Sequence, residues 1–474
     1  MRNYSKIAAA VAVALGSGSA LAANPTWTQS LVIAGSSALR DATANEMSTV
    51  LCTAGTYAAW VSAKGAGGSF DTPDFRAYTC TLAAGLGAPL AGVQVIVYYR
   101  SEGGSIFGVF GNSVLNGGAS TPINRLNLGP SGGAECTDSG AIALGITQPT
   151  AANVEADNQG TLNASCVAKD TVQLGFSDVE PAAFVGENYG SEYTFIPYKQ
   201  PTVAVLNSLD KGRMIGQAWT AIVSNAGGAT SLFKNANGFS AAGLSNQELA
   251  SIFAGKVTDW GNVPSAQALG AALGNSPITV CRREPGSGTQ TTASTHFLLT
   301  NCSSGGLSFD TPTSGSGNNV VEGFATSDVL TCVQTGTNAI GIVTAQTAAK
   351  ITGAAATQIL VNGAGATPGA AANDVANAAA QGKYNWYSEA YYVKNDSALP
   401  AGSFQLALAN KIISDLQSAN NTPTNANAPN LIGIPGIGGN TPFSPVTPYK
   451  AGQQIPIAIG QTNGNTCTPV TDVL

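Results

Sequence analysis

The sequence predicts an α/β fold in which a mostly parallel sheet is covered by helices. The first observation is a local pattern that occurs four times: an apolar run ends in small polar residues, which then open a helix. Continuous apolar runs are typical of parallel strands that are buried on both faces. The four stretches are LVIAGSSALRD (31–41), VQVIVYYRSEGGS (93–105), TVQLGFSDVEP (171–181) and PITVCRREPGSGTQTT (277–292).

The second observation is the length and composition of the chain. It has 474 residues, of which 44% are hydrophobic and 10% are charged. This length is enough for two or three domains, and the composition is not that of a chain kept disordered by its charge. We therefore expect a folded protein with more than one domain.

Residues 1–22 have the features of a cleavable secretory signal. Arg2 and Lys6 precede an apolar run, and small residues end at Ala22, after which we place the cleavage. No cysteine that could carry a lipid anchor precedes Cys52, and no later apolar stretch approaches the ~18 residues of a membrane span. We expect a soluble protein that is periplasmic or secreted. Loss of Arg2 and Lys6 takes the 20 basic residues to 18 against 26 acidic ones, a net charge of −8, so nucleic acid is not an expected partner.

The cysteines predict disulfide bonds, because their number is even and the expected compartment is oxidising. The sequence has one histidine and no CxxC motif, so we expect neither a metal site nor a cofactor. All eight cysteines follow the expected cleavage point: Cys52, Cys80, Cys136, Cys166, Cys281, Cys302, Cys332 and Cys467.

The stretch RREPGSGTQTT (282–292) has the chemistry of an anion-binding turn. The carboxyl ends of parallel strands meet at a crevice, and the helices that follow direct their free N–H groups and positive dipole ends into it. Gly286 and Gly288 permit a tight turn, Ser287 and Thr289 supply hydroxyls, and Arg283 can hold an oxyanion with two donors. The alternative is a capped helix whose arginines form surface ion pairs.

At this stretch the chain resembles the periplasmic phosphate-binding proteins that serve ABC phosphate importers. RREPGSGT (282–289) is similar to the RR-x-x-GSGT segment of that family. The resemblance implies a two-lobe type 2 periplasmic-binding-protein fold, with mostly parallel central sheets and a hinge of two crossings. Six further stretches match in the same order: AGSSAL (34–39), YRSEGG (99–104), GFSDVEP (175–181), LSNQELASIFAGKVTDWGNV (244–263), GSGNNVV (315–321, as a helix start) and NAIGIVTAQTA (338–348).

The resemblance also implies a set of ligand contacts. Asp178 has a role that follows from its charge: it would accept a hydrogen bond from hydrogen phosphate and reject sulfate, which carries no proton. The alternatives are a helix cap or an arginine partner for Asp178, and helix caps for Ser37 and Ser101. The implied ligand-binding residues are Ser37, Ala38, Ser101, Asp178, Arg283, Ser287, Gly288 and Thr289.

Two acidic residues depart from the family pattern. Pro285 occupies the position where the family usually has a second acid, and Glu284 lies beside it. Glu102 stands where a small polar residue is expected. A glutamate that points inward would weaken phosphate binding or change the preferred ligand, so the identity of the oxyanion stays open.

The resemblance places the crossings near residues 212–225 and 386–396. Lobe I is then expected over residues 23–216, lobe II over 217–390, and the return to lobe I, with an extended tail from Pro435, over 391–474. Residues 42–92 and 106–170 are longer than single connections need, so we interpret them as insertions, each held by its own disulfide. These would be Cys52–Cys80 and Cys136–Cys166.

The predicted function is that of an exported, monomeric solute-binding protein, which captures phosphate or a related oxyanion for ABC-type uptake. Two alternatives stay open: a secreted phosphatase-like enzyme on the same scaffold, and a surface or matrix structural protein. Against catalysis, His296 is the only histidine and no G-x-S-x-G motif occurs, so neither a catalytic triad nor a histidine-ligated metal centre is easily built.

Overall fold

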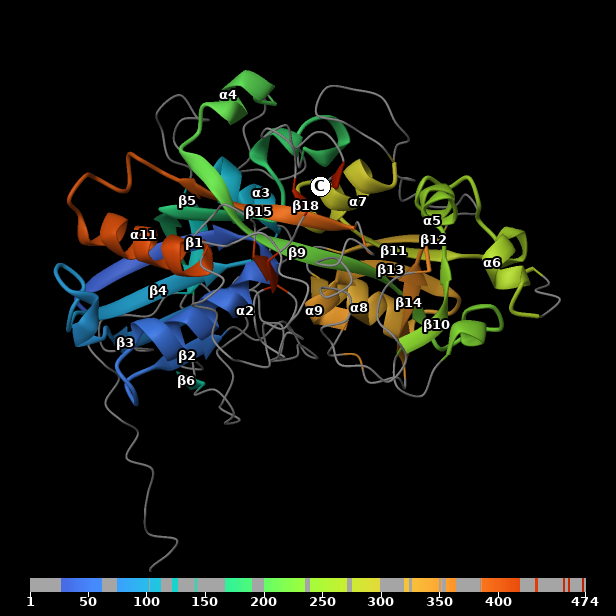
Figure 1. Ribbon diagram of the computed structural model, residues 1–474, viewed down its shortest axis with the longest axis horizontal. Coiled ribbons are helices and arrows are strands. Elements are labelled where there is room, and N and C mark those ends of the chain that lie inside the picture. The colour runs from blue at the N-terminus through green and yellow to red at the C-terminus, as the bar shows by residue number, and fades with distance from the viewer. Residues whose placement is uncertain are drawn as a thin grey trace, which may run out of the picture.

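Two lobes, each built on half of one continuous sheet, make up the computed structural model (Figure 1). Within the described residues, no helix has the length and apolar character that a bilayer crossing requires. The predicted signal, residues 1–22, lies outside them. The structure describes residues 27–61, 75–101, 103–111, 122–126, 141–142, 167–189, 200–234, 239–270, 275–298, 319–323, 326–348, 351, 355–363, 384, 386–417, 431–433, 455–456, 459–460 and 471–472.

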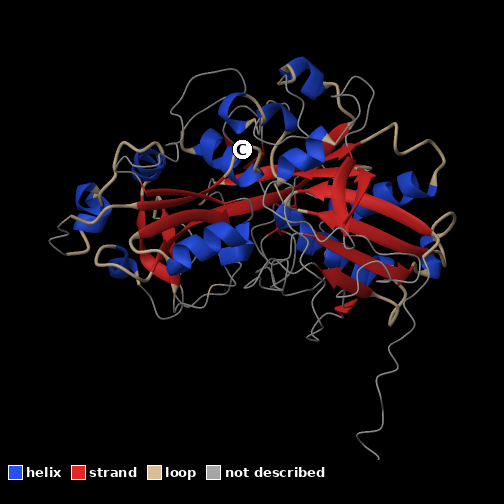
Figure 2. Ribbon diagram, turned by 180° about the vertical axis from the view of Figure 1, so that it is seen from behind, coloured by secondary structure: helices blue, strands red, loops and turns tan. Residues whose placement is uncertain are grey.

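Lobe I has three parallel strands at its centre. Strand β1 (Gln29–Gly35) lies between β4 (Gln94–Arg100) and β8 (Leu174–Ser177) and is parallel to both. Strands β3 (Phe75–Thr81) and β2 (Ala58–Val61) extend the sheet beyond β4 in antiparallel order. The central strands are almost entirely buried, because helices cover both faces of the sheet (Figure 2).

Lobe II repeats this arrangement. Strand β11 (Thr279–Arg283) lies between β12 (Asn319–Gly323) and β13 (Ala339–Thr344) and is parallel to both. Strand β14 (Ala356–Val361) pairs in parallel with β10 (Phe239–Leu244). In each lobe, parallel strands therefore deliver their carboxyl ends to one edge of the sheet, as expected from the apolar runs of the sequence.

Two strands join the lobes. Strand β9 (Lys211–Ser224) pairs with β15 (Tyr387–Lys394) through its first half, and with β13 and β14 through its second half. All three pairings are antiparallel. The chain thus passes between the lobes along β9 and returns along β15, which lie side by side in Figure 1.

The main helices follow the strand ends or pack on the sheet. The described helices are α2 (Ser37–Glu46), α3 (Ser105–Phe110), α4 (Val203–Asn207), α5 (Asn246–Phe253), α6 (Pro264–Gln267), α7 (Gly288–His296), α8 (Thr326–Thr335), α9 (Ala345–Ala348) and α11 (Phe404–Gln417). Shorter turns are the π-helix Met47–Leu51 and the 3-10 helices Ala84–Leu86, Pro181–Ala183, Gly186–Asn188, Thr230–Phe233 and Trp260–Asn262.

The remaining strands are short and lie at the margins. Strand β16 pairs with β9 at Gly216 and Gln217, and β17 pairs with β16. This places residues 455–456 of the expected tail beside β16, one strand away from β9, whereas most of the tail lies outside the described residues. These strands are β5 (Pro122–Leu126), β6 (Ala141–Ile142), β7 (Val167–Thr171), β16 (Leu431–Gly433), β17 (Ile455–Pro456), β18 (Ile459–Gly460) and β19 (Thr471–Asp472).

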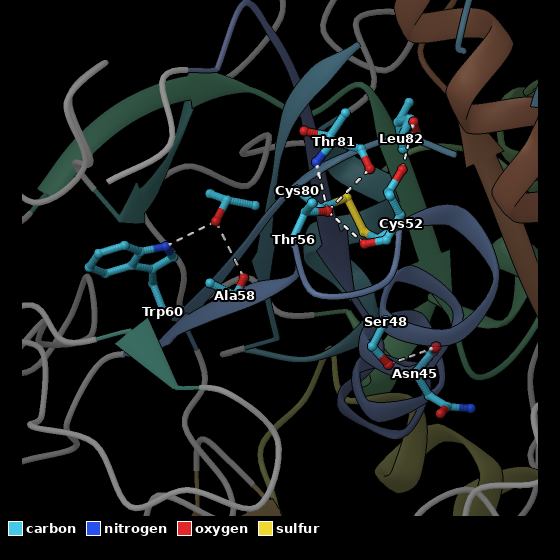
Figure 3. The surroundings of a disulfide bond; sticks show 11 residues. Asn45, Ser48, Cys52, Thr56, Ala58, Trp60, Cys80, Thr81 and Leu82 are labelled. Carbon is cyan, nitrogen blue, oxygen red and sulfur yellow. Dashed lines mark hydrogen bonds between the residues drawn. A yellow bond between two sulfur atoms is a disulfide. The ribbon is translucent and has the colours of Figure 1, made fainter. Parts of the chain in front are cut away.

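A disulfide between Cys52 and Cys80 holds the first predicted insertion, as expected (Figure 3). It ties the chain after the π-helix to β3, where Thr81 N donates to Thr56 Oγ1 at 3.2 Å. The stretch is part of the lobe I sheet, since it contributes β2 and β3. A second disulfide joins Cys281 of β11 to Cys332 of α8. The predicted pair Cys136–Cys166, together with Cys302 and Cys467, lies outside the described residues.

Two local predictions are wrong. The apolar run that ends at Ser177 is followed by the 3-10 helix Pro181–Ala183 instead of an α-helix. Pro181 takes the first position of this short helix, and Glu180 before it is extended at ψ 137°. Residues 319–321, predicted within a helix start, instead belong to strand β12, where β-branched Val320 and Val321 favour an extended backbone. The helix, α8, begins at Thr326.

Candidate functional site

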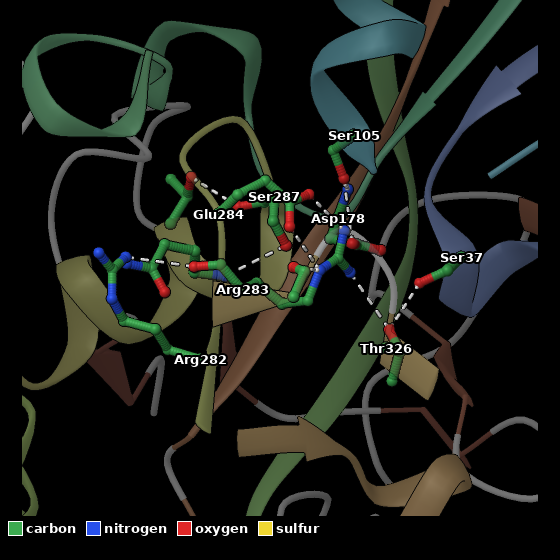
Figure 4. Close-up of polar contacts among 11 residues, drawn as sticks. Ser37, Ser105, Asp178, Arg282, Arg283, Glu284, Ser287 and Thr326 are labelled. Atoms are coloured by element: carbon green, nitrogen blue, oxygen red, sulfur yellow. Dashed lines mark hydrogen bonds and ion pairs between the residues drawn. The ribbon is translucent and has the colours of Figure 1, made fainter. Parts of the chain in front are cut away.

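The turns that follow β1, β4, β8 and β11 meet where the two lobes touch (Figure 4). Backbone hydrogen bonds join the turns directly: Ile106 N donates to Gly286 O at 3.0 Å, and Gly286 N donates to Asn188 O at 3.1 Å. Side chains do so as well, since Ser37 Oγ of lobe I lies 3.0 Å from Thr326 Oγ1 of lobe II. The predicted gathering of four strand-end turns is therefore present.

Asp178 lies at the centre of this junction with only 2% of its surface exposed. Its carboxylate accepts hydrogen bonds from Ser36 Oγ and, at 3.0 Å, from Ser105 Oγ. Burial raises the pKa of Asp178 above its ordinary value, and the two serines, the nearby amide of Gln217 and the charge of Arg283 offset only part of that rise. These donors and the guanidinium act against the effect of burial, which favours the protonated form of Asp178.

Arg283 is fully buried and forms an ion pair with the adjacent Glu284, with Nη2 2.8 Å from Oε1. Its Nε also donates to Gly323 O at 3.1 Å, and its Nη1 donates to Thr326 Oγ1 at 3.3 Å. Glu284 thus points inward and provides the acid that Pro285 does not. The surface ion pair considered for Arg283 is wrong, because both partners are removed from solvent.

The turn before α7 presses against lobe I. A Cβ atom added at Gly288 would lie 2.4 Å from Ser105 Oγ and 2.5 Å from Asp178 Cβ, so only glycine permits this approach. Ser287 caps α7 by accepting a hydrogen bond from Gln290 N at 3.5 Å. Its hydroxyl proton is still available to a second acceptor. The predicted cap role of this motif and a ligand role are therefore compatible.

The other predicted residues lie at helix starts or one turn away. Ala38 and Thr289 are buried in the first turns of α2 and α7, where backbone N–H groups have no acceptor within their own helix. Ser101 is buried, and its hydroxyl accepts a hydrogen bond from Arg40 Nη1 at 3.1 Å. Ser37 contacts Thr326 instead of Asp178. Glu102 lies outside the described residues.

Five side chains of the junction were not predicted. Ser36, instead of Ser37, caps α2 and contacts Asp178, although the AGSSAL match contains both. Ser105 is the residue at which the SEGGS turn becomes a helix, so the strand-then-helix pattern could have indicated it. No local signal marks the remaining three, which the fold brings in from distant elements: Arg40, Gln217 and Thr326.

His296 lies at the far end of α7, away from Asp178. Its ring stacks on Trp386 with centroids 5.8 Å apart, and burial lowers the pKa of His296 to about 4. A neutral, packed imidazole is the expected core role. Among the described residues, no group of three or more metal-ligating side chains could hold a metal ion.

Two half-sheets joined by two strands, with strand-end turns from both lobes in contact, define the two-lobe type 2 periplasmic-binding-protein fold. Residues 219–422 match the model of the PBP superfamily domain. The match confirms the predicted resemblance at superfamily level.

The solved structures that match the chain share little sequence with it. A putative phosphate ABC transporter substrate-binding protein with bound phosphate from Clostridium perfringens has 12% identity and a TM-score of 0.41, over 83% of this chain and 95% of that one. The periplasmic phosphate-binding protein PfluDING has 13% identity and a TM-score of 0.37, over 83% and 87%. A possible phosphate binding protein from Planctomyces limnophilus has 11% identity and a TM-score of 0.31, over 81% and 87%. No curated protein matches the chain.

Proposed function

We propose that this protein is an exported solute-binding protein that holds phosphate or a related tetrahedral oxyanion between its lobes, for uptake by an ABC-type importer. The observation that carries the proposal is the junction of four strand-end turns around buried Asp178 and Arg283. The proposed ligand contacts are Ser37, Ala38, Ser101, Asp178, Arg283, Ser287, Gly288 and Thr289.

The junction offers donors for an anion together with one acceptor for a proton. Helices α2 and α7 both begin here, so their first-turn N–H groups and positive dipole ends favour negative charge. Asp178 then requires a ligand with an O–H group, because a carboxylate facing an unprotonated oxyanion is repulsive. Hydrogen phosphate and hydrogen arsenate satisfy both demands at neutral pH, whereas sulfate does not.

Glu284 changes the balance of charge at this junction. Because its carboxylate pairs with Arg283, the two side chains together carry no net charge. The anion therefore depends on the helix N-termini and hydroxyls for much of its stabilisation, with the guanidinium as one donor among several.

The first test is thermal unfolding of the purified mature protein with phosphate, arsenate or sulfate. Phosphate and arsenate should raise the unfolding temperature, with a stabilisation of RT ln(1 + [L]/Kd), about 2.7 kcal/mol at a hundredfold excess over Kd. Sulfate should have little effect. If none of the three anions stabilises the fold, the proposal is wrong, and the alternative of a structural protein is favoured.

A second test removes the guanidinium without leaving a buried charge. The single change Arg283→Ala would leave Glu284 unpaired in the interior, so we choose Arg283→Met with Glu284→Gln. This double variant should bind phosphate at least about tenfold more weakly by calorimetry. The matched control is Arg282→Met with Glu322→Gln, an ion pair (2.8 Å) one residue earlier on β11, where alternate side chains point to opposite faces. Equal losses in both double variants would contradict the proposed role of Arg283.

A further inference from the structure

Gln217 has a buried amide that lies beside Asp178. Only 2% of the residue is exposed, and neither Oε1 nor Nε2 has a hydrogen-bond partner in the described part of the chain. The amide lies close enough to Asp178 to lower the pKa of that carboxyl, although no hydrogen bond of normal geometry joins the two side chains. Gln217 is therefore at the junction of the turns, and among the described residues its amide has no well-formed hydrogen bond.

The backbone holds this amide in place. Gln217 lies on the crossing strand β9, where it is paired with Ser388 of β15 on one side and with Leu431 of β16 on the other. A residue with both neighbours in register cannot turn its side chain away without breaking the sheet. Since an unsatisfied buried amide destabilises a fold, a core position here would favour an apolar side chain of the same size.

We propose that Gln217 is a further ligand-binding residue, whose Nε2 donates to an oxygen of a bound tetrahedral oxyanion next to the one that faces Asp178. This inference rests on the proposed function and extends the site to the crossing strand. An amide is suited to this place because it donates to the anion without adding charge beside Asp178. The acceptor Asp178 and the donor Gln217 would then contact different oxygens of one ligand, one protonated and one not.

The test compares Gln217→Leu with the wild-type protein by calorimetric titration with inorganic phosphate. Loss of a hydrogen bond to a charged group should raise Kd by about ten- to a hundredfold. Without phosphate, the unfolding temperature of the variant should equal or exceed that of the wild type, because a buried unsatisfied amide has been removed. A residue with only a structural role would give the opposite pattern.

The matched control is Gln358→Leu. Gln358 is a glutamine of similar burial, 3% exposed, on β14, but its Nε2 donates to Thr220 Oγ1 at 3.0 Å. The Gln358→Leu variant should unfold at a lower temperature than the wild type and bind phosphate with the wild-type Kd. If Gln217→Leu fails to fold, Gln217→Met provides the same test with a straight side chain.

The outcomes separate this inference from the function on which it rests. If the wild-type protein binds no phosphate, arsenate or sulfate, the proposed function fails. If the wild type binds phosphate and the Gln217 variants bind it equally well, only the inference fails. The inference also fails if, in the absence of phosphate, the unfolding temperature decreases as much in the Gln217 variants as in Gln358→Leu.

Discussion

Asp178 and Glu284 are both buried carboxyl groups at the junction, but their neighbours give them different roles. Glu284 faces the guanidinium of Arg283, so its charge is already compensated. Asp178 faces the hydroxyls of Ser36 and Ser105, which donate to it without neutralising it. Hydroxyl donors leave lone pairs of the carboxylate available to a proton of the ligand. Asp178 is therefore the acid expected to select the ligand.

The change Asp178→Asn should alter selectivity more than affinity alone. The amide can donate as well as accept, so it no longer repels a fully ionised oxyanion. We expect the ratio of phosphate affinity to sulfate affinity to fall by at least about tenfold in competition titrations. The control is Asp170→Asn, a half-exposed partner of Arg125 on the surface. An unchanged ratio in the Asp178 variant would disprove the proposed role of Asp178.

At the scale of residues, the sequence indicated the site where motif and chemistry coincide. Asp178, Arg283 and Gly288 follow apolar strands within recognisable stretches, and the fold brings all three to the junction. Ser36 was missed by one position, because two adjacent serines can each cap the same helix. Gln217 has no local signal at all. It lies inside a long apolar strand, and only the pairing of β9 shows what it faces.

At the scale of elements, the repeated pattern of strand, turn and helix correctly predicted three of its four α-helices. It holds for α2, α3 and α7, which each begin within two to five residues of a strand end. It fails after β8, where the 3-10 helix Pro181–Ala183 stands in place of an α-helix. Asp178 lies in the bend that directly follows β8, and its side chain meets Ser36 and Ser105 from two of the other turns.

Helix α2 begins at the junction, and its last residue lies near α11, where two buried acidic side chains interact. Glu46 is the last residue of α2, and Asp415 lies in α11, where Lys411 pairs with it. Burial, together with the nearby carboxyl group of Asp415, raises the pKa of Glu46 from 4.5 to about 9. Glu46 is therefore protonated in the folded protein at neutral pH, whereas the unfolded chain releases that proton.

This difference predicts how stability changes with pH. Between about pH 4.5 and 9 the folded protein holds a proton at Glu46 that the unfolded chain lacks, so the free energy of unfolding should fall as pH rises. In Glu46→Gln the amide does not ionise, so this part of the pH dependence should vanish. The free energy of unfolding of the variant should therefore increase relative to that of the wild type as the pH approaches 9. Urea unfolding at several pH values measures the effect. Parallel curves for the two proteins would contradict it, and Asp415→Asn should flatten the slope in the same direction.

At the scale of the whole molecule, the crossings were expected from the family resemblance, and β9 and β15 occupy those stretches. The contacts between the lobes were not predictable, because they join turns far apart in sequence. Ile106 meets Gly286, and Ser37 meets Thr326, which lies 289 residues away. Neither the periodicity nor the composition of the sequence indicates that such residues are in contact. The contact can be seen only once the positions of the two lobes relative to each other are known.

These contacts imply that phosphate should close the molecule. Within the described residues, the lobes also meet at the turns that form the proposed site, so ligand contacts and lobe contacts stabilise the same arrangement. Phosphate should therefore reduce the radius of gyration measured by X-ray scattering. Calorimetric binding without any change in scattering would show that the lobes do not close on the ligand.

One variant tests the lobe contact itself. Thr326→Val removes the hydroxyl that meets Ser37 and that accepts from Arg283, so phosphate affinity should fall several-fold, in keeping with about 1 kcal/mol per hydrogen bond. More phosphate should then be needed for the same change in scattering. The matched control is Thr335→Val at the other end of α8, where the hydroxyl donates only within the helix, to Thr331 O at 2.8 Å. Both changes replace a threonine on the same helix, so a difference in phosphate affinity between the two variants measures the effect of the contact between the lobes. Equal affinities would show that this contact does not contribute to phosphate binding.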